Sequence, residues 1–289
     1  MKNINWSELG FGYFKTDYNV RCEYKDGKWG ELYATEDVNM NIHMASTCLH
    51  YGQEVFEGLK AFRGADGKVR LFRVEENAKR MINSGEYLKM AVPSVELFTK
   101  ACIEAVKLNA DYIPPYGSGA SLYLRPMLIG VGPQVGVKPS ADYLFAVFVT
   151  PVGPYYKDGF NCIKVIIDYD HDRAAPKGTG HVKVGGNYAA SLDSGEIAHQ
   201  KGFASVIFLD PATKQYIDEC SAANFFGIRD GKYITPDSHS VLPSITNKSL
   251  RQIAEDLGLK VEQRKVGVEE LPTFSEAGCC GTAAVISPI

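Results

Sequence analysis

The sequence predicts an α/β (α+β) fold made of two domains, and three observations lead to this prediction. Stretches rich in β-branched and aromatic residues alternate with stretches in which apolar residues recur at helical spacing. The chain has 289 residues, which suits one large domain or two of roughly 150 residues each. Pro, Gly and Tyr are concentrated at 151–159, between two strand-like stretches, as is typical of an interdomain linker. We therefore expect a smaller α+β domain at 1–152, a linker at 153–160 and a larger α/β domain at 161–289.

The composition excludes several classes of protein. Hydrophobic residues make up 45% and charged residues 22% of the chain, which argues against a disordered or fibrous protein. The net charge of −3 argues against nucleic-acid binding. The uncharged stretch at 143–156 contains prolines and is shorter than the about 20 residues of a spanning helix. Seven cysteines without a CxxC pair favour reduced thiols over a disulfide framework or a zinc site. We therefore expect a cytoplasmic protein that binds no metal, nucleic acid or membrane.

Turn residues and hydrophobic spacing predict the elements of the first half. A helix is expected to follow Pro93, and Ser94 is a suitable N-cap for it. The strands of this half are expected to be antiparallel. The other expected elements are a hairpin from 55–63 and 68–72, a helix over 75–84, and strands over 121–129 and 143–150.

The second half predicts shorter strands and two helices. Apolar residues recur from Leu250 at i, i+3, i+4 and i+7, which predicts a helix that Thr246 caps and Gly258 ends. The other expected elements are a strand over 162–169, a helix over 189–201 ended by Gly202, and short strands over 205–209, 215–219, 223–228 and 232–235.

Two motifs carry groups that suit a nitrogen-containing ring. Lys183 precedes a glycine pair, Gly185-Gly186, and a lysine that forms a Schiff base needs small neighbours so that a ring can approach. The alternative is an ordinary surface lysine. Glu219 ends a predicted strand, where a carboxylate can pair with a pyridine nitrogen and keep it protonated. The alternative is a solvated glutamate at a strand end.

Two further motifs suit an anion. The segment 242–246 (LPSIT) leads into the best-marked helix, where backbone N–H groups and the helix dipole favour a phosphate; an ordinary capped helix is the alternative. Backbone donors of the glycine loop at 278–284 (GCCGTAA) can form an anion-binding nest, or the loop is a tight turn between strands. A third glycine-rich stretch, 178–186, lacks the GxGxxG and GK[ST] spacings, so it does not indicate nucleotide binding.

These four motifs, in this order and spacing, resemble the class IV family of pyridoxal-phosphate aminotransferases, specifically its branched-chain amino-acid aminotransferases. The segments 49–64 (LHYGQEVFEGLKAFRG), 121–126 (SLYLRP) and 151–156 (PVGPYY) are similar to hallmark segments of that group. The resemblance runs from about Leu9 to the last residue. It implies the two-domain fold type IV of pyridoxal-phosphate enzymes, as in D-amino-acid aminotransferase, and a homodimer whose sites take residues from both subunits.

The resemblance also implies which residues bind the cofactor, pyridoxal 5'-phosphate. Lys183 matches the Schiff-base lysine, which is the catalytic residue and carries a proton between the substrate α-carbon and the cofactor. Glu219 matches the partner of the pyridine nitrogen, and Tyr188 matches the tyrosine that hydrogen-bonds the ring oxygen O3′. Arg80 matches the phosphate-binding arginine, whose planar guanidinium suits a dianion. The other phosphate contacts fall to the backbone N–H groups of Ile245 and Thr246 and to the hydroxyls of Thr246 and Thr282.

The substrate pocket follows from spacing and from the same resemblance. Tyr123 and Arg125 are two apart on a predicted strand, so the two-residue period places both on one face. Both match pocket residues of the family, where the arginine is available to the side-chain carboxylate of glutamate. The resemblance adds apolar walls from Tyr51, Phe56 and Tyr155, and a site for the substrate α-carboxylate at the backbone N–H groups of Thr282 and Ala283.

Three positions are open or depart from the family pattern. An aromatic pocket residue is expected near the N-terminus, at Phe14 or Tyr13. Asn247 stands where the family usually has Lys or Arg after the Ile-Thr pair, which loosens the match at the phosphate end. Relatives usually continue beyond the position of Ile289, so the larger domain is expected to be incomplete at its C-terminal end.

The implied reaction transfers the amino group of L-leucine, L-isoleucine or L-valine to 2-oxoglutarate, giving branched 2-oxo acids and L-glutamate. A D-amino-acid aminotransferase or an aminodeoxychorismate lyase would share the Lys, Glu and phosphate residues, but Tyr123, Arg125 and the segment 51–58 favour the branched-chain enzyme. A pyridoxal-phosphate-binding protein without turnover is the alternative from another class. The expected partners are small amino acids, 2-oxo acids and a second copy of the chain.

Overall fold

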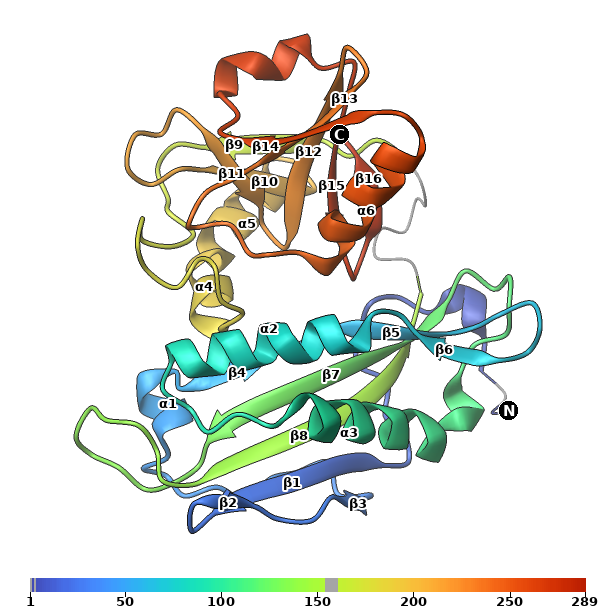
Figure 1. The fold of residues 1–289 in the computed structure, drawn as a ribbon, viewed down its shortest axis with the longest axis vertical. Coiled ribbons are helices and arrows are strands. Elements are labelled where there is room, and N and C mark those ends of the chain that lie inside the picture. Colours follow the sequence, from blue (N-terminus) through green and yellow to red (C-terminus); the bar gives the residue numbers. More distant parts are fainter. Residues whose placement is uncertain (1, 3, 154–160) are drawn as a thin grey trace. The chain divides into compact units, whose positions relative to one another are not determined.

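A computed structural model describes residues 2, 4–153 and 161–289 of the chain (Figure 1). The chain forms two compact units, unit 1 at Met1–Lys157 and unit 2 at Asp158–Ile289. Each unit combines helices with a β-sheet, which confirms the predicted α/β (α+β) class. The predicted linker at 153–160 lies outside the described residues except for Gly153.

Unit 1 is built from an antiparallel sheet and the helices beside it. Its strands are β1 (Asn19–Lys25), β2 (Lys28–Trp29), β3 (Tyr33–Thr35), β4 (Glu54–Phe56), β5 (Leu59–Arg63), β6 (Val69–Leu71), β7 (Ser121–Gly130) and β8 (Tyr143–Val152). Its helices are α1 (Thr47–Tyr51), α2 (Val74–Tyr87) and α3 (Val95–Leu108), with 3-10 turns at η1 (Trp6–Glu8) and η2 (Ala110–Tyr112).

The sheet of unit 1 has one face under helices and one face that carries predicted site residues. Its strands run in the order β2-β1-β8-β7-β5-β6, with β3 beside β1 and β4 beside β7. Helix α3 packs on the sheet through Phe98, whose ring stacks on that of Phe145 in β8 at a centroid distance of 5.8 Å (Figure 1). Because strand residues alternate between faces, Arg125 of β7 and Phe148, its partner in β8, point to the other face.

The predicted hairpin forms between β5 and β6, but the strand expected over 55–63 is divided into β4 and β5 at Glu57 and Gly58. Both parts pair with β7, and Pro126 of β7 lies opposite the break. A proline has no N–H to give to the ladder, although its carbonyl accepts from the Glu57 N–H at 2.8 Å. The break leaves the Glu57 side chain fully buried.

The other elements predicted for unit 1 are present. The hydroxyl of Ser94 accepts a hydrogen bond from the Leu97 N–H at 3.1 Å, which confirms Ser94 as the N-cap of α3. The strands β7 and β8 pair antiparallel along their whole length. Helix α2 extends beyond the predicted 75–84 at both ends.

Unit 2 is built from a mixed sheet with helices. Its strands are β9 (Val165–Asp168), β10 (Ser205–Leu209), β11 (Ile217–Cys220), β12 (Ala223–Arg229), β13 (Lys232–Pro236), β14 (Lys260–Arg264), β15 (Glu276–Gly281) and β16 (Val285–Pro288). Its helices are α4 (Gly185–Ala190), α5 (Leu192–Gln200) and α6 (Ile245–Asp256), with a 3-10 turn at η3 (Val268–Thr273).

The sheet of unit 2 runs in the order β14-β13-β12-β11-β10-β9, with β15 paired to β12 and to β16. The pairs β9–β10 and β13–β14 are parallel, because helices connect their strands. The core between the strands contains Ile207, Ile217 and Phe225. The vicinal Cys279 and Cys280 of β15 are 2% and 0% exposed, as expected for small apolar residues in a core.

Two expectations for unit 2 are wrong in detail. The helix predicted over 189–201 is two helices that meet at Ser191, whose hydroxyl donates to the Tyr188 carbonyl at 2.8 Å and so competes with continuous helix bonding. Thr246 does not cap α6, because Ser244 accepts from the Asn247 N–H at 3.1 Å and the helix starts at Ile245. The segment 278–284 has the second of its two expected forms, a turn between strands: β15 ends within it and a turn leads into β16.

In the part of the chain that the structure describes, no helix is both long enough and apolar enough to cross a bilayer. The same residues contain no group of three His, Cys, Asp or Glu side chains placed to bind a metal ion.

Candidate active site

Lys183 and Tyr188, two of the cofactor residues that the resemblance implied, meet at the start of α4. The Lys183 Nζ donates to the Tyr188 hydroxyl at 2.5 Å and lies 4.9 Å from the centre of its ring. Helix α4 begins two residues after Lys183, at the glycine pair. A Cβ atom added to Gly186 would meet nothing within 4 Å, so there is room for another molecule beside this turn.

The loop that carries Lys183 is held by Asn187, which is 3% exposed. Its side-chain amide donates to the carbonyls of Thr179 and Val182, at 2.7 and 3.0 Å. The Thr179 hydroxyl donates back to the Asn187 side-chain oxygen at 2.6 Å. These bonds fix the backbone on both sides of the turn, so the position of Lys183 is determined before any ligand binds.

Glu219 lies on β11 in the interior of unit 2 and is 4% exposed. Its Oε2 accepts from the Asn224 side-chain amide at 2.9 Å. Its Oε1 is in ion-pair contact with Arg173, yet this atom accepts no hydrogen bond of good geometry from the described residues. A buried carboxylate oxygen in this state can accept a bond from a ligand donor.

Burial raises the pKa of Glu219 to about 7, and the charges of Arg173 and Lys183 act against this rise. The negative charge of Asp218 adds to it. Glu219 is therefore poised between its charged and neutral forms near neutral pH, and a cationic ligand donor would favour the charged form.

Asn224 connects Glu219 to the segment that precedes α6. Besides Glu219, its side-chain amide reaches the Leu242 carbonyl at 3.2 Å. Ile245 and Thr246 occupy the first two positions of α6, where backbone N–H groups point out of the helix. The predicted phosphate residues of this segment are thus joined to the predicted ring residue Glu219 through a single side chain.

Thr282 and Ala283 lie in the turn between β15 and β16. The register across three strands pairs Glu219 with Asn224 and Asn224 with Cys280. Because the turn follows two residues after Cys280, it leaves the same end of the sheet at which Glu219 and Asn224 lie. The structure thus brings the predicted cofactor residues of unit 2 to one region.

Arg80 lies on α2 in unit 1 and is paired with Glu57. Its Nε and Nη2 contact the two carboxylate oxygens at 2.7 and 2.8 Å, and both side chains are buried. Asn77 and the Gly58 N–H also donate to Glu57 Oε2, at 2.7 and 3.2 Å. This pair fixes the orientation of the predicted phosphate arginine, since a bidentate contact leaves a guanidinium little freedom.

Tyr123, Arg125 and Phe56 lie together in unit 1, on the face of the sheet that points away from α3. Arg125 Nη2 donates to the Tyr123 hydroxyl at 3.2 Å, and its guanidinium carbon is 4.8 Å from the centre of the Phe56 ring. The Nε of Arg125 is buried and has no acceptor among the described residues. A planar donor group with an unused N–H, beside an aromatic ring, suits a carboxylate attached to an apolar chain.

Gly58 makes room for this arrangement. A Cβ atom at Gly58 would come within 2.2 Å of the Tyr123 hydroxyl oxygen, far inside van der Waals contact. A glycine is therefore required at the break between β4 and β5 for Tyr123 to lie where Arg125 contacts it.

Phe11 is the N-terminal aromatic residue that contacts this group, and neither of the two candidates from the sequence does so. Its ring packs edge-on against that of Tyr123 at a centroid distance of 5.2 Å. The Phe14 ring packs on Tyr112 instead, and the Tyr13 ring packs on Phe148. The sequence could not distinguish these positions, because the segment forms neither a helix nor a strand and so has no periodicity.

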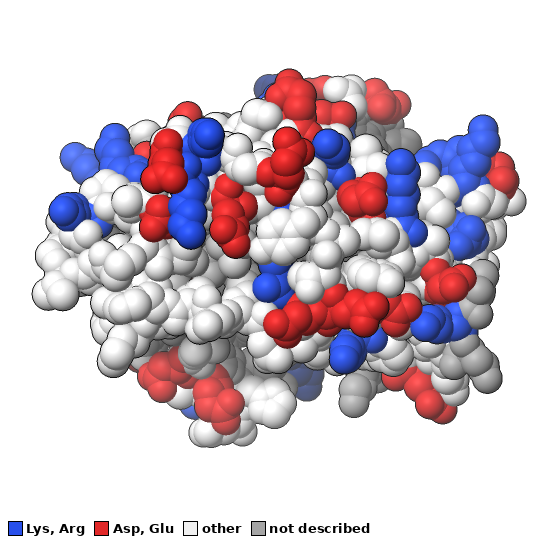
Figure 2. Space-filling view, turned by 90° about the horizontal axis from the view of Figure 1, so that it is seen from below, with Lys and Arg blue, Asp and Glu red and all other residues white. Residues whose placement is uncertain are grey.

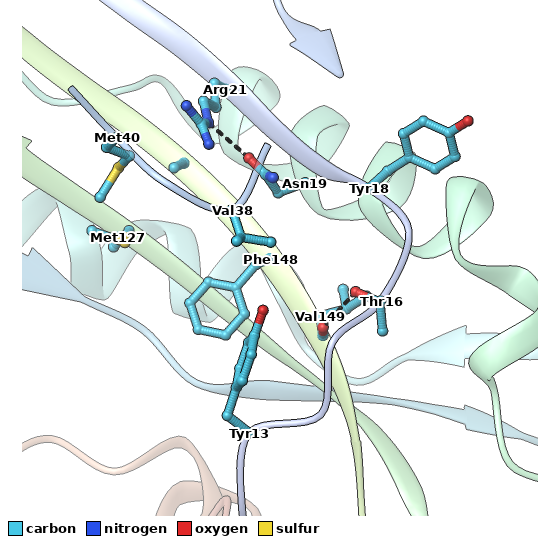
Figure 3. A pocket seen from close by; sticks show the side chains of 11 residues that line it. Tyr13, Thr16, Tyr18, Asn19, Arg21, Val38, Met40, Met127, Phe148 and Val149 are labelled. Atoms are coloured by element: carbon cyan, nitrogen blue, oxygen red, sulfur yellow. Dashed lines mark hydrogen bonds between the residues drawn. The ribbon is translucent and has the colours of Figure 1, made fainter. Parts of the chain in front are cut away.

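Figure 3 shows a pocket on the same face of the sheet, with Tyr13 and Phe148 beside Met40, Met127 and Arg21. Of the residues that border it, only Tyr13 was considered from the sequence, as one of the two candidates for an N-terminal pocket aromatic. It therefore adjoins Arg125 through the Arg125–Phe148 pair of the ladder without being part of the predicted site.

Two further residues were predicted for the substrate pocket, Tyr51 and Tyr155. Tyr51 is 41% exposed at the end of α1, and its hydroxyl donates to the Val135 carbonyl. Tyr155 lies outside the described residues.

Four residues of the site were not predicted from the sequence: Arg173, Asn224, Glu57 and Asn77. Arg173, Glu57 and Asn77 each contact a charged residue of the site from a distant part of the chain, and a single sequence has no local pattern that reports such a contact. Asn224 is only five positions from Glu219, across the turn between β11 and β12.

Comparison with known proteins gives consistent similarities. The family model described as "Amino-transferase class IV" matches residues 54–289. The branched-chain-amino-acid aminotransferase of Haemophilus influenzae is 53% identical over 100% of this chain and 86% of its own length. The structure of the branched-chain amino acid aminotransferase from Escherichia coli aligns with a TM-score of 0.77 at 30% identity, over 95% of this chain and 85% of that one. The branched-chain amino acid aminotransferase from Thermobaculum terrenum, solved in its PLP-form, aligns with a TM-score of 0.76 at 25% identity, over 95% and 85%.

Proposed function

The chain belongs to the class IV aminotransferase family, and from this premise we propose the reaction and the roles of its residues. The enzyme transfers the amino group of L-leucine, L-isoleucine or L-valine to 2-oxoglutarate, with pyridoxal 5'-phosphate as cofactor. The products are branched 2-oxo acids and L-glutamate. The single observation that carries the proposal is the trio in unit 2, in which Lys183 bonds to Tyr188 and acts electrostatically on the buried Glu219.

The residues of unit 2 fit the cofactor chemically. The buried Glu219 Oε1, which accepts no hydrogen bond from the described residues, would accept a hydrogen bond from a protonated pyridine nitrogen. Lys183 offers a primary amine next to a phenol hydroxyl, the two groups that an aldehyde and its neighbouring ring oxygen require. Pyridoxal phosphate, when bound, supplies an electron sink for the bond that breaks at the substrate α-carbon.

Each side chain has one task in this reaction. Lys183 would hold the cofactor through its amine, and the free amine would move the proton at the substrate α-carbon. Glu219 holds a proton on the pyridine nitrogen, because its carboxylate gains a bonded cation in a buried setting. Tyr188 orients the ring oxygen and the lysine amine.

Each unit carries groups that we propose for phosphate binding. In unit 2 these are the first-turn N–H groups of Ile245 and Thr246 and the hydroxyls of Thr246 and Thr282; the start of a helix favours a dianion. In unit 1, Arg80 would add a permanent positive charge whose direction Glu57 fixes.

The substrate-binding role falls to Tyr123, Arg125 and Phe56, with Tyr51, Tyr155 and the N–H groups of Thr282 and Ala283. The unused Arg125 Nε supports a contact with the side-chain carboxylate of glutamate and 2-oxoglutarate. Phe56 and Phe11 offer apolar surface to a branched side chain. One pocket therefore serves two kinds of side chain, with the charged one held by Arg125.

We also propose that the enzyme is a homodimer in the cytoplasm. Two neighbouring segments of unit 1 expose large apolar residues: Met44 is 82%, Val135 86% and Val137 85% exposed. The bond from the Gln134 N–H to the Ala45 carbonyl at 2.9 Å joins these segments. Figure 2 shows few charged residues on the side where Figure 1 places α1 and the loop between β7 and β8. Apolar surface of this kind suits a partner chain, and seven free thiols suit a reducing compartment.

The test of the function is a substrate panel with the purified enzyme and pyridoxal phosphate. All three branched L-amino acids should react with 2-oxoglutarate. Their specificity constants should differ by less than about 200-fold, the equivalent of the about 3 kcal/mol that one methylene provides at most. Activity with D-amino acids, or lyase activity, in place of this pattern would contradict the proposal, as would cofactor binding without turnover.

The test of assembly is the molar mass in solution, measured by light scattering. The wild-type chain should have the mass of a dimer. The variant Val135→Asp/Val137→Asp should shift toward the monomer, because it places charge in the proposed contact. A monomeric wild type would contradict the proposal.

A further inference from the structure

Arg173 lies in the loop between β9 and α4 and is 9% exposed. Its Nη2 donates to the Gly180 carbonyl at 2.9 Å and to the Ser240 carbonyl, and it is in ion-pair contact with Glu219 Oε1. These three acceptors belong to three separate segments. Gly180 is in the loop that leads to Lys183, Ser240 is in the loop that leads to α6, and Glu219 is on β11.

The two loops that Arg173 joins lie in direct contact. A Cβ atom at Gly180 would come within 2.4 Å of the Ser240 carbonyl oxygen and 2.7 Å of its Cα. Gly180 and Ser240 are both buried, and buried backbone carbonyls need a hydrogen-bond donor. The Arg173 guanidinium is this donor, since both carbonyls accept from it.

The segment around Arg173 is itself anchored. The Lys214 Nζ donates to the His171 carbonyl at 2.9 Å and forms an ion pair with Asp172. His171 is bonded to the side chains of Asp168 and Asp193 on either side of it, at 2.9 and 3.2 Å. Ion pairs and hydrogen bonds therefore hold the backbone next to Arg173 in place, and the guanidinium extends from it into the interior of unit 2.

We propose that Arg173 is a positioning residue for the cofactor site. It fixes the Lys183 loop, the loop before α6 and Glu219 relative to one another, and it favours the charged form of the Glu219 carboxylate through a permanent counter-charge. The second part rests on the proposed pairing of Glu219 with the pyridine nitrogen.

The charges around Glu219 show why a permanent counter-charge matters. The groups that act on it are Arg173, Lys183 and Asp218, and the thiols of Cys220 and Cys280 also feel its charge. Of the two cations, Lys183 is the reacting amine, so its charge changes during the reaction. A guanidinium stays protonated at every working pH. Arg173 is thus the cation that favours the charged form of Glu219 throughout turnover.

The test compares Arg173→Met, Arg173→Lys and Arg229→Met. Arg229 pairs with Glu270 at the surface of the same unit and serves as the matched control. The first measurement is the pH midpoint of the Glu219 carboxyl in the full chain before the cofactor is added. Carbon NMR of protein labelled at the glutamate Cδ measures this midpoint. The Glu219 signal is identified by its absence from the spectrum of Glu219→Gln.

Loss of the counter-charge in Arg173→Met should raise the Glu219 midpoint by about 1–3 pH units, the range for one adjacent opposite charge. Arg173→Lys should recover at least half of this shift, because it keeps the charge. Arg229→Met should leave the midpoint unchanged. An unchanged midpoint in Arg173→Met would overturn the electrostatic part of the proposal. If Arg173→Met does not fold, Arg173→Lys and Gly180→Ala still test the positioning part.

The second measurement is the affinity for pyridoxal phosphate, read from the absorbance change on binding. Arg173→Met and Gly180→Ala should both weaken binding at least about tenfold, because each separates the two loops. Gly180→Ala should leave the Glu219 midpoint in place, since it changes no charge. Wild-type affinity in both variants would overturn the positioning part.

Failure of the proposed function gives a different result. If Glu219→Gln retains wild-type activity and cofactor affinity, Glu219 is not the partner of the pyridine nitrogen, and that role is lost. The midpoint shift in Arg173→Met would still support the Arg173–Glu219 coupling, because it is measured without the cofactor.

Discussion

Each unit of this protein buries one arginine–glutamate pair next to a predicted site, and the two pairs differ in how completely the carboxylate is bonded. In unit 1, Glu57 accepts from Arg80 through both oxygens, and Asn77 and the Gly58 N–H add two more donors. In unit 2, Glu219 has Asn224 on one oxygen, while the other contacts Arg173 without a well-formed hydrogen bond from the described residues. The same residue types therefore give a saturated pair and an unsaturated one.

The difference indicates what each pair does. A saturated buried carboxylate has no capacity left for a ligand, so the role that we propose for Glu57 is to orient Arg80. An unsaturated one is costly in the free protein and gains a partner when a cationic donor binds. Counting the donors on each oxygen thus separates a supporting pair from a binding residue, where burial and residue type alone would not.

Removal of the Glu57 charge should have the largest effect. Glu57→Gln leaves Arg80 buried without its counter-ion, and breaking a buried pair costs about 3–5 kcal/mol. Both tryptophans, Trp6 and Trp29, lie in unit 1, so denaturant unfolding followed by tryptophan fluorescence reports on this unit. The control Glu75→Gln, on the exposed side of α2, should stay within about 0.5 kcal/mol of wild type. A Glu57→Gln loss as small as that of the control would remove the distinction between the pairs.

The stability of the cofactor-free protein should show the pH dependence of an unsaturated carboxyl at Glu219. Its pKa is raised from 4.5 to about 7, so the unfolded chain loses this proton before the folded one does. Stability relative to Glu219→Gln should therefore fall as the pH rises from about 4.5 to 7, by about 3 kcal/mol in total, and stay level above.

Denaturant unfolding of wild type and Glu219→Gln at a series of pH values, followed by circular dichroism, measures this difference. A difference that rises with pH over the same window would show that Glu219 is stabilised in its charged form before the cofactor binds, and the two pairs would then not differ in the way described.

Substitution of the two asparagines that donate to these carboxylates should have different effects, one on stability and the other on cofactor affinity. Asn77→Ala removes a donor from the saturated pair and should cost about 1–3 kcal/mol of stability, with cofactor affinity unchanged. Asn224→Ala should weaken cofactor affinity about tenfold, because Asn224 also joins Glu219 to the segment before α6. Unfolding curves of both variants measure the loss of stability, and absorbance titrations measure the loss of cofactor affinity. Equal losses of affinity would contradict it.

The smallest expected effect concerns the substrate side of unit 1. In Gly58→Ala the new methyl group meets the Tyr123 hydroxyl, so Tyr123 must move and its bond to Arg125 is lost. The KM for 2-oxoglutarate should rise about tenfold, the equivalent of about 1.4 kcal/mol, and the KM for leucine should rise less. The control Gly195→Ala, on α5 with nothing within 4 Å, should leave both values unchanged. An equal rise for both substrates would argue against Arg125 as the carboxylate-binding residue.

Features with a local cause could be predicted from the sequence. The period of a strand places Tyr123 and Arg125 on one face, and Ser94 caps α3 as expected. Lys183 and Tyr188 are also near each other in the chain, but the family resemblance assigned Tyr188 to the site. In these cases the interacting residues are within a few positions of each other, so hydrophobic spacing and turn chemistry suffice.

Features with a distant cause could not be predicted. The division between β4 and β5 depends on Pro126 in another strand, and the charged state of Glu219 depends on Arg173 from a loop. The cap of α6 was misplaced by two residues because Ser244 and Thr246 are equally good caps by type, and only the backbone conformation selects Ser244. Tertiary contacts thus determine where the strands break, which residue caps the helix and which charges surround Glu219.

The most direct test of the proposed mechanism is the identity of the amine that binds pyridoxal phosphate. The purified enzyme is reduced with borohydride in the presence of the cofactor, digested, and the labelled peptide located by mass spectrometry. We expect one phosphopyridoxyl group, on Lys183, and none in Lys183→Ala. A label on another lysine, or unchanged labelling in Lys183→Ala, would contradict the mechanism.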